Sequence, residues 1–303
     1  MILITGANGN LGRRLLRELA GQVPLRAVVR SQRAADTIGR ENLDGVEVRI
    51  IDYLDEAAMT EAAEGCSHIV HLVGIIKESA GSSFEAAHEG TTAVVIAAAR
   101  AAGVERIVYL SILGTSEGSS NACLASKARA EGLLLASGLG VLVLRVPMVL
   151  GEGDYATRAL AGRARGAFAL QFRAGSLEQP IYAGDVVQAM LAGLDRNPAV
   201  QLSAGALEED LAGPESLTRA ALTGRAAAVL GETGPRILSL PVGLGLLMAG
   251  LLERLSANPP VSRAMLGVLD HDDQIDPSQA ALRLGVALTP LDEALRATLV
   301  ESP

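Results

Sequence analysis

Three glycines near the start of the chain have the spacing of a phosphate-binding turn. Gly6, Gly9 and Gly12 lie between an apolar run and a segment rich in helix formers. In a strand–turn–helix unit, Gly6 would permit the tight turn, Gly9 would let the backbone approach a pyrophosphate, and Gly12 would let the helix lie against the strand. The N–H groups at the helix start, and the positive end of the helix dipole, would then face the phosphates. The alternative is a strand-to-helix turn that binds nothing.

Polar residues and a glycine at the ends of later predicted strands extend this site. Arg30 closes the second strand, where NAD-preferring sites usually place Asp or Glu for the ribose 2′-hydroxyl. A guanidinium with Ser31 and Arg33 beside it suits a 2′-phosphate, so Arg30 favours NADP(H), with NAD as the alternative cofactor. A solvent-exposed arginine without a ligand is the other interpretation. Asp52 follows the third strand, where an adenine contact is expected, and Gly74 marks the end of the fourth.

The elements that must position these residues alternate along the first half of the chain. Apolar runs predict strands near 2–4, 24–30, 46–51, 68–76, 105–111 and 141–146. Helical patterns near 11–20, 83–102 and 122–137 separate several of them. This alternation predicts an α/β fold, a Rossmann-like doubly wound parallel sheet with helices on both faces.

After Pro147 the alternation loosens, which predicts a small, mostly helical C-terminal lobe. We expect the NAD(P)-binding domain to span 1–150 and to receive about 178–197 as well. The smaller lobe, for substrate or partner, would then comprise 151–177 and 198–303.

The segment 237–252 carries no charged residue, and Pro241 divides it into a short strand and a helix of about 242–255. It is shorter than the ~20 residues that a bilayer crossing needs, so no transmembrane segment is expected. Burial within the C-terminal lobe is the favoured interpretation of this helix. Contact with a partner or a membrane surface is the alternative.

The composition limits the class of protein. Of 303 residues, 49% are apolar and 2% aromatic, so the core must be built from Ala, Leu, Val and Ile. The net charge of −8 and the scattered basic residues argue against nucleic acid as the partner. Cys66 and Cys123 give neither a disulfide framework nor metal-ligand spacing, and His68 and His71 are expected to be structural, so no metal site is predicted. A strand beginning at residue 2 leaves no room for a signal or transit peptide, which favours the cytoplasm.

Several motifs together resemble the extended and atypical short-chain dehydrogenase/reductase superfamily, whose members include NAD-dependent epimerases and dehydratases. They are TGANGNLG, Ser111, a lysine in the helix after the fifth strand, LRVPMVLGEGD and QPIYAGDV. HLVGII, AGPESLT, NPPVSRAMLGVLDHDDQ and LGVALTPLDEAL narrow the resemblance to one branch. That branch comprises the bacterial relatives of the nucleotide-binding accessory subunit of respiratory complex I.

In active members of this superfamily a Ser, a Tyr and a Lys act together, and the resemblance implies catalytic roles for Ser111 and Lys127. Cys123 occupies the position of the tyrosine. A thiol on one carbon falls several bond lengths short of a substrate placed for a phenol, so Cys123 is not expected to be competent. Lys127 would still hold the nicotinamide ribose. Tyr155 is the alternative source of a hydroxyl.

The resemblance and the motifs together define the expected cofactor site. Its residues are Gly6, Asn8, Gly9, Asn10, Leu11, Gly12, Arg30, Asp52, Tyr53, Leu72, Val73, Gly74, Lys127, Pro147 and Val149.

Three functions remain open at this point. The favoured one is an NAD(P)(H)-binding protein with weak or no dehydrogenase activity, in an accessory, assembly or redox-sensing role. A small apolar or quinone-like ligand, or a respiratory-complex partner contacting 242–255 at the inner membrane face, would suit this role. The second is an active NADPH-dependent oxidoreductase or nucleotide-sugar epimerase/dehydratase with altered acid–base groups. The third is a cofactor-free scaffold, against which the intact glycine turn argues.

Overall fold

The computed structural model describes residues 1–79, 81–195, 205–255, 262–268 and 271–300. The chain divides into two compact units. The first unit comprises Met1–Arg145, Val186–Glu209 and Arg283–Gly285. The second comprises Val146–Asp185, Asp210–Leu282 and Val286–Pro303.

The first unit is built on a seven-stranded sheet with the order β11-β6-β5-β4-β1-β2-β3. The pairs β3–β2, β2–β1, β1–β4 and β4–β5 are parallel. The order 3-2-1-4-5-6 within this sheet is that of a dinucleotide-binding Rossmann fold. The strands are β1 (Ile2–Thr5), β2 (Leu25–Val29), β3 (Val46–Ile50), β4 (His68–His71), β5 (Arg106–Ile112), β6 (Gly140–Val146) and β11 (Ala206–Asp210).

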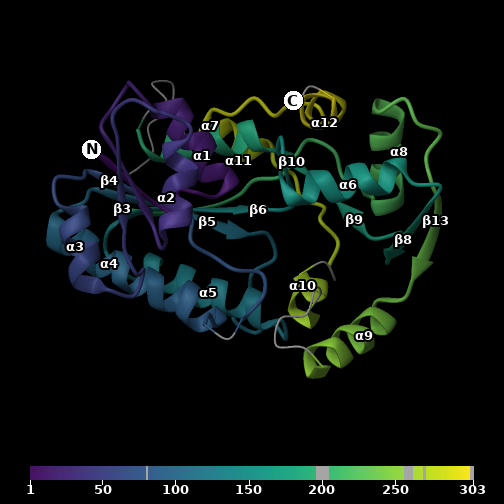
Figure 1. Cartoon of the computed structure of the whole chain (residues 1–303), viewed down its shortest axis with the longest axis horizontal. Coiled ribbons are helices and arrows are strands. Elements are labelled where there is room, and N and C mark those ends of the chain that lie inside the picture. Colours follow the sequence, from purple (N-terminus) through teal and green to yellow (C-terminus); the bar gives the residue numbers. More distant parts are fainter. Residues whose placement is uncertain (80, 196–204, 256–261, 269–270, 301–303) are drawn as a thin grey trace. The chain divides into compact units, whose positions relative to one another are not determined.

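Helices cover both faces of this sheet (Figure 1). Helices α3, α4 and α5 lie along one face, and α1 and α2 lie on the other (Figure 1). The helical elements that begin or end in this unit are α1 (Asn10–Leu19), α2 (Gln32–Gly39), α3 (Glu56–Ala63), η1 (Glu85–Gly90), α4 (Thr91–Ala102), α5 (Ala122–Leu135), α7 (Ala183–Gly193) and α11 (Ser278–Leu284).

The central strands are apolar on both faces because helices shield both sides of the sheet. Leu3, Ile69 and Ile107 are each 0% exposed. Aliphatic side chains dominate the core cluster around them, as the composition predicts, and Tyr53 and Tyr109 are its aromatic members.

Two elements differ from their expected form. The fourth strand, predicted over 68–76, pairs only to His71, since beyond Leu72 the chain turns away to line a cavity. The helix predicted over 83–102 begins with the π-helical turn η1, whose backbone hydrogen bonds span one residue more than those of an α-helix. Such turns often occur at functional sites.

The second unit combines short two-stranded sheets with helices. Strands β10 and β7 are parallel, β12 and β9 antiparallel, and β13 and β8 parallel. Its elements are β7 (Val149–Leu150), α6 (Tyr155–Arg165), β8 (Phe168–Phe172), β9 (Leu177–Glu178), β10 (Ile181–Tyr182), β12 (Leu217–Thr218), α8 (Arg219–Val229), β13 (Arg236–Leu240), α9 (Val242–Leu255), α10 (Arg263–Val268) and α12 (Leu291–Leu299).

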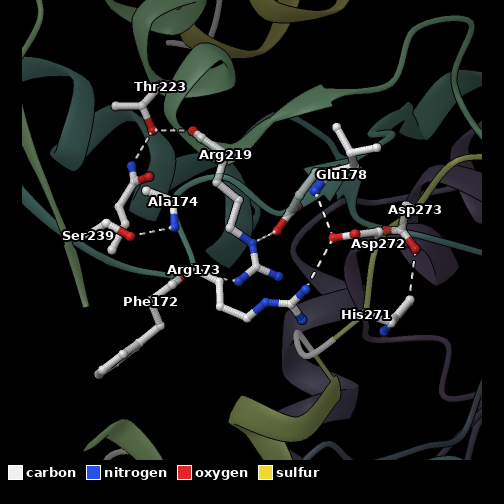
Figure 2. Close-up of polar contacts among 12 residues, drawn as sticks. Phe172, Arg173, Ala174, Glu178, Arg219, Thr223, Ser239, His271, Asp272 and Asp273 are labelled. Carbon is white, nitrogen blue, oxygen red and sulfur yellow. Dashed lines mark hydrogen bonds and ion pairs between the residues drawn. The ribbon is translucent and has the colours of Figure 1, made fainter. Parts of the chain in front are cut away.

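An arginine joins the small sheets of this unit. Arg219 donates through Nε to Glu178 Oε1 at 2.5 Å and through Nη1 to the Phe172 carbonyl at 3.0 Å (Figure 2). Glu178 and Arg219 are both largely shielded from solvent, so this pair fixes β8 against β9 from the first residue of α8.

The expectation that helix 242–255 is buried is wrong for its larger side chains. Leu247 and Leu251 of α9 are 68% and 58% exposed. Gly245 and Gly250 face inward instead, because a Cβ there would lie 2.7 Å from the Phe172 ring and 2.1 Å from the Arg263 guanidinium. Among the described residues, no helix is both long and apolar enough to cross a bilayer.

Candidate functional site

The glycine turn adopts the geometry that its spacing predicts. Gly6 has φ +66°, a left-handed conformation that disfavours a side chain. A Cβ at Gly12 would lie 2.7–2.8 Å from backbone atoms of Ala7, so only glycine lets α1 start this close to the turn. Gly9 donates its N–H to the Gly6 carbonyl at 3.0 Å, which closes the turn.

The first turn of α1 has donors available for a ligand. Gly9 is the N-cap residue, and no side chain caps this helix. In the same unit, Ser31 caps α2 and Asp55 caps α3 with side-chain oxygens. The backbone N–H groups that open α1 therefore have the arrangement of a phosphate site, including those of Asn10 and Leu11.

A cavity of about 630 Å³ adjoins this turn. It is lined by Gly6, Asn8, Gly9, Arg30, Ser31, Arg33, Ala34, Thr37, Asp52, Tyr53, Leu54, Leu72, Val73, Gly74, Ile75, Gly81, Ser82, Ala86, Ala87 and Thr91. Nine of the residues expected to bind the cofactor are in this lining. Its size is within the range of small-molecule and cofactor sites.

One end of the cavity is polar and cationic. Arg30, Ser31 and Arg33 follow β2 directly, and Thr37 lies one helical turn after Arg33. The i, i+4 spacing of Arg33 and Thr37 is a signal in the sequence that could have added Thr37 to the expected site. Asp52 also lines the cavity, and its Oδ1 accepts the N–H of Leu54 at 3.1 Å.

Tyr53 supports the glycine turn from below. Its hydroxyl accepts the N–H of Gly6 at 3.1 Å and donates to the Val28 carbonyl at 3.2 Å. Burial raises the pKa of this phenol, so it stays neutral. Tyr53 therefore couples the turn to β2 as well as lining the cavity.

Lys127 is not itself in the cavity lining but lies beside Gly74, which is. A Cβ at Gly74 would be 3.2 Å from both Cε and Nζ of Lys127. Nζ donates to the Leu110 carbonyl at 2.9 Å and lies 4.4 Å from the Tyr109 ring centroid, in cation–π geometry. Burial lowers the pKa of Lys127 to about 8.

Cys123 lies one turn before Lys127 on α5 and is 0% exposed. Its Sγ is 3.4 Å from the Ile75 carbonyl, which accepts the thiol proton. Burial raises the pKa of the thiol to about 11. At neutral pH this side chain is a protonated, enclosed group.

Ser111 makes a contact that the sequence did not indicate. Its hydroxyl donates to Glu131 Oε1, which also accepts from Thr115 Oγ1 at 2.9 Å. Arg145 pairs with the other oxygen of this carboxylate at 2.6 Å. Glu131 is on the same helix as Lys127, one turn further on, so α5 fixes the rotamer of Ser111.

The sequence patterns also gave no indication of His88. The π-helical turn η1 directs it toward the cavity wall, where Nε2 accepts the N–H of Ile75 at 3.1 Å. Its Nδ1 is 2.7 Å from Ser126 Oγ on α5. Burial, and then the nearby Lys127 charge, lower the pKa of His88 to about 3, so a neutral imidazole joins η1, the cavity wall and α5.

The cavity lining does not include His71, His68, Pro147 or Val149. His71 is buried and bonds Thr5 Oγ1 at 2.7 Å, and His68 Nδ1 is 2.9 Å from Ser67 Oγ, as expected of structural histidines. Among the described residues, no group of three or more His, Cys, Asp or Glu forms a metal site. Pro147 and Val149 belong to the second unit.

A 3-2-1-4-5-6 parallel sheet, an uncapped glycine turn and the adjoining cavity define a Rossmann-type dinucleotide-binding protein. The residues fit such a cofactor, because a side chain at Gly6 or Gly12 would collide with backbone that lines or supports the turn. The chain belongs to the NAD(P)H-binding family, whose sequence model matches residues 6–170. It accordingly binds a nicotinamide dinucleotide.

Three proteins of named function are similar in sequence. Ceramide reductase of Caulobacter vibrioides is 29% identical over 256 residues, which are 83% of this chain and 77% of that protein. Quinone oxidoreductase 2 of Escherichia coli is 37% identical over 116 residues, 37% of each chain. The mitochondrial NADH dehydrogenase [ubiquinone] 1 alpha subcomplex subunit 9 of Arabidopsis thaliana is 28% identical over 254 residues, 81% of this chain and 61% of that one.

Solved structures share the fold. The NADPH-dependent quinone oxidoreductase QOR2 of Escherichia coli, complexed with NADPH, superposes with a TM-score of 0.71 at 24% identity, covering 98% of this chain and 99% of that one. A nucleoside-diphosphate-sugar epimerase from Staphylococcus aureus gives 0.74 at 19% identity, covering 97% and 99%. The sequence similarity to the complex I subunit agrees with the branch that the sequence motifs resemble, whereas the epimerase structure shows the shared fold alone.

Proposed function

We propose that this protein holds NADP(H) at the glycine turn and has lost the tyrosine-dependent proton transfer of its superfamily. When bound, the nicotinamide supplies or accepts a hydride. The observation that carries the proposal is Cys123, which is enclosed at the tyrosine position with a protonated thiol bonded to the Ile75 carbonyl.

The preference for NADP(H) rests on the cationic end of the cavity. Arg30 and Arg33, with the hydroxyl of Ser31, supply the donors that a 2′-phosphate requires, whereas the Thr37 hydroxyl donates to the Arg33 carbonyl at 2.9 Å. A carboxylate that would accept the 2′-hydroxyl of NAD is missing from the lining directly after β2. Asp52 would contact the adenine from the neighbouring strand end.

In this proposal Lys127 contacts the cofactor and Ser111 does not. Lys127 faces Gly74 with a charged amino group and would hold the nicotinamide ribose. Ser111 gives its proton to Glu131, so its hydroxyl is committed to a structural partner. The site thus retains the groups that bind the cofactor, and it has lost the phenol that would move a proton.

The biological role that suits such a site is accessory, assembly or redox-sensing. Sensing would act through the oxidation state of the bound cofactor, because the buried thiol of Cys123 is protected from oxidants. A quinone-like or other small apolar molecule is the proposed second ligand, since quinone oxidoreductase 2 and a ubiquinone-linked NADH dehydrogenase subunit are among the relatives. A respiratory-complex partner is the corresponding assembly role.

An active NADPH-dependent reductase is the second candidate, favoured by one observation. The pKa of Lys127 is lowered to about 8, so its ammonium group can donate a proton near neutral pH. The similarity to ceramide reductase covers most of the chain and agrees with this candidate.

A binding and turnover experiment separates the two. NADPH should raise the unfolding temperature of the purified protein, since a ligand at 100 times its Kd adds about 2.7 kcal/mol to the stability of the native state. NADPH oxidation with a quinone acceptor should not exceed the rate without protein. Turnover that disappears in Cys123→Ser would refute the loss of catalysis. Turnover that survives in Cys123→Ser and disappears in Lys127→Met at saturating NADPH would establish the second candidate.

A further inference from the structure

The parallel ribbon of β8 and β13 exposes its larger apolar side chains on one face. Side chains alternate between its faces, and Leu170 stands directly opposite Leu238. The face that carries them is exposed: Phe168, Leu170 and Leu238 have 72%, 65% and 57% of their surfaces in solvent. The large apolar residues therefore point outward.

The opposite face of the same ribbon carries Ala169 and Gln171, which are buried, and Ile237 and Ser239. Gln171 donates to Thr223 Oγ1 of α8 at 2.6 Å. Ser239 Oγ accepts the N–H of Ala174 at 3.1 Å (Figure 2). Phe172, on the apolar face, points away from this polar network (Figure 2). The largest apolar side chains of this ribbon therefore form an exposed patch, and such patches mark interaction sites.

Helix α9 likewise exposes its larger apolar side chains. Leu244, Leu247, Met248 and Leu251 follow the i, i+3, i+4, i+7 pattern of one helical face, and all are exposed. Its inward face consists of small residues, among them Gly245, which packs on the ring of Phe172. Since Phe172 is on the outward face of the ribbon, this contact packs the inward face of α9 against one end of that ribbon face. We call the exposed apolar residues of β8, β13 and α9 the docking surface.

Cations border the docking surface. Arg236 is on the ribbon face, opposite Phe168, and Arg254 continues the exposed helix stripe three residues after Leu251. Both are exposed, and no carboxylate among the described residues pairs with either of them. Although the net charge of the chain is −8, an apolar surface edged by these two arginines favours an anionic partner.

We propose that the docking surface binds an anionic lipid bilayer. Apolar side chains on one helix face insert at the boundary between headgroups and acyl chains, and arginines at the edge pair with anionic headgroups. A second copy of the chain is a poorer occupant, because a two-fold contact would oppose like charges and unite two chains of net negative charge. This activity goes beyond NADP(H) binding and uses residues of the second unit alone.

The test measures binding of the full chain to vesicles by co-sedimentation. Vesicles of phosphatidylcholine mixed with phosphatidylglycerol should bind the protein, and phosphatidylcholine alone should bind it much more weakly. The double variant Leu247→Ser/Leu251→Ser should bind at least tenfold more weakly, because it removes two side chains that enter the bilayer. Arg236→Gln and Arg254→Gln should each reduce binding about fivefold.

Matched controls come from exposed residues elsewhere in the second unit. Leu282→Ser on α11, where Leu282 is 76% exposed, and Arg158→Gln on α6 should leave vesicle binding unchanged. Failure of the wild-type chain to bind anionic vesicles would overturn the proposal, as would an equal loss in Leu282→Ser. A wild-type dimer that Leu247→Ser/Leu251→Ser converts to a monomer, without vesicle binding, would assign the surface to a second copy. NADPH titration of the same samples tests the proposed function independently, because the docking surface is not part of the cofactor site.

Discussion

Replacing Gly12 by alanine tests whether the glycine turn holds α1 in place for a ligand. The new Cβ would lie 2.7 Å from the Ala7 carbonyl oxygen and 2.8 Å from Ala7 C and Cα, where ordinary contacts begin at 3.4 Å. All three atoms are backbone, so the helix itself must shift. Forcing a methyl group into such a space costs about 1–3 kcal/mol, against which alanine gains about 1 kcal/mol in helix propensity. We expect a net loss of up to about 2 kcal/mol.

The same shift moves the N–H groups that open α1. Losing one charge-assisted hydrogen bond to a phosphate costs about 1.5–3 kcal/mol, which is at least a tenfold weaker Kd for NADPH. Thermal unfolding and calorimetric titration measure the two effects separately. The control is Gly224→Ala in α8, where a Cβ meets nothing within 4 Å and stability should rise by up to about 1 kcal/mol. A Gly12→Ala protein with wild-type stability and wild-type NADPH affinity would refute the reasoning.

Three further results are expected. Because Cys123 is enclosed and its thiol pKa is raised to about 11, iodoacetamide should leave it unmodified in the native protein and modify it in urea; rapid native labelling would contradict this. If the cofactor contacts the charged form of Lys127, NADPH affinity should fall as the pH rises through about 8, approaching tenfold per pH unit, and Lys127→Met should remove this dependence. Burial lowers the pKa values of His71 and His88 to about 3, so the unfolded chain binds more protons between pH 3 and 6.5. The free energy of unfolding, from urea titrations, should therefore drop by about 3 kcal/mol between pH 6.5 and 5, and a flat profile would argue against neutral buried imidazoles.

The sequence predicts the parts of this protein that depend on local geometry. The glycine spacing identifies the turn because each of the three positions has its own steric reason, visible in the left-handed Gly6 and the crowded Gly12. Arg30 is found in the cavity because the end of a parallel strand always lies at the ligand-binding edge of the sheet.

The sequence patterns do not predict contacts between residues that are far apart along the chain. The hydroxyl of Tyr53 meets Gly6, 47 residues away, and Ser111 meets Glu131 from another element. His88 reaches Ile75 through a π-helical turn, which no periodicity in an Ala-rich segment indicates.

The orientation of α9 could not be predicted for a similar reason. A stretch that is apolar all round gives no sign of which face turns inward. The small residues Gly245 and Gly250 decide the orientation, because only they fit against Phe172 and Arg263.

The most direct test of the account is the ratio of the Kd values for NADH and NADPH, measured by calorimetric titration on the wild-type chain and on Arg30→Ala. The cationic end of the cavity predicts a ratio well above one in the wild type. Arg30→Ala should reduce that ratio about tenfold or more by weakening NADPH binding alone, since a charged hydrogen-bonded contact contributes about 1.5–3 kcal/mol. Failure to bind either dinucleotide would contradict the central claim, and a preference for NADH that Arg30→Ala leaves unchanged would contradict the assignment of Arg30 to the 2′-phosphate.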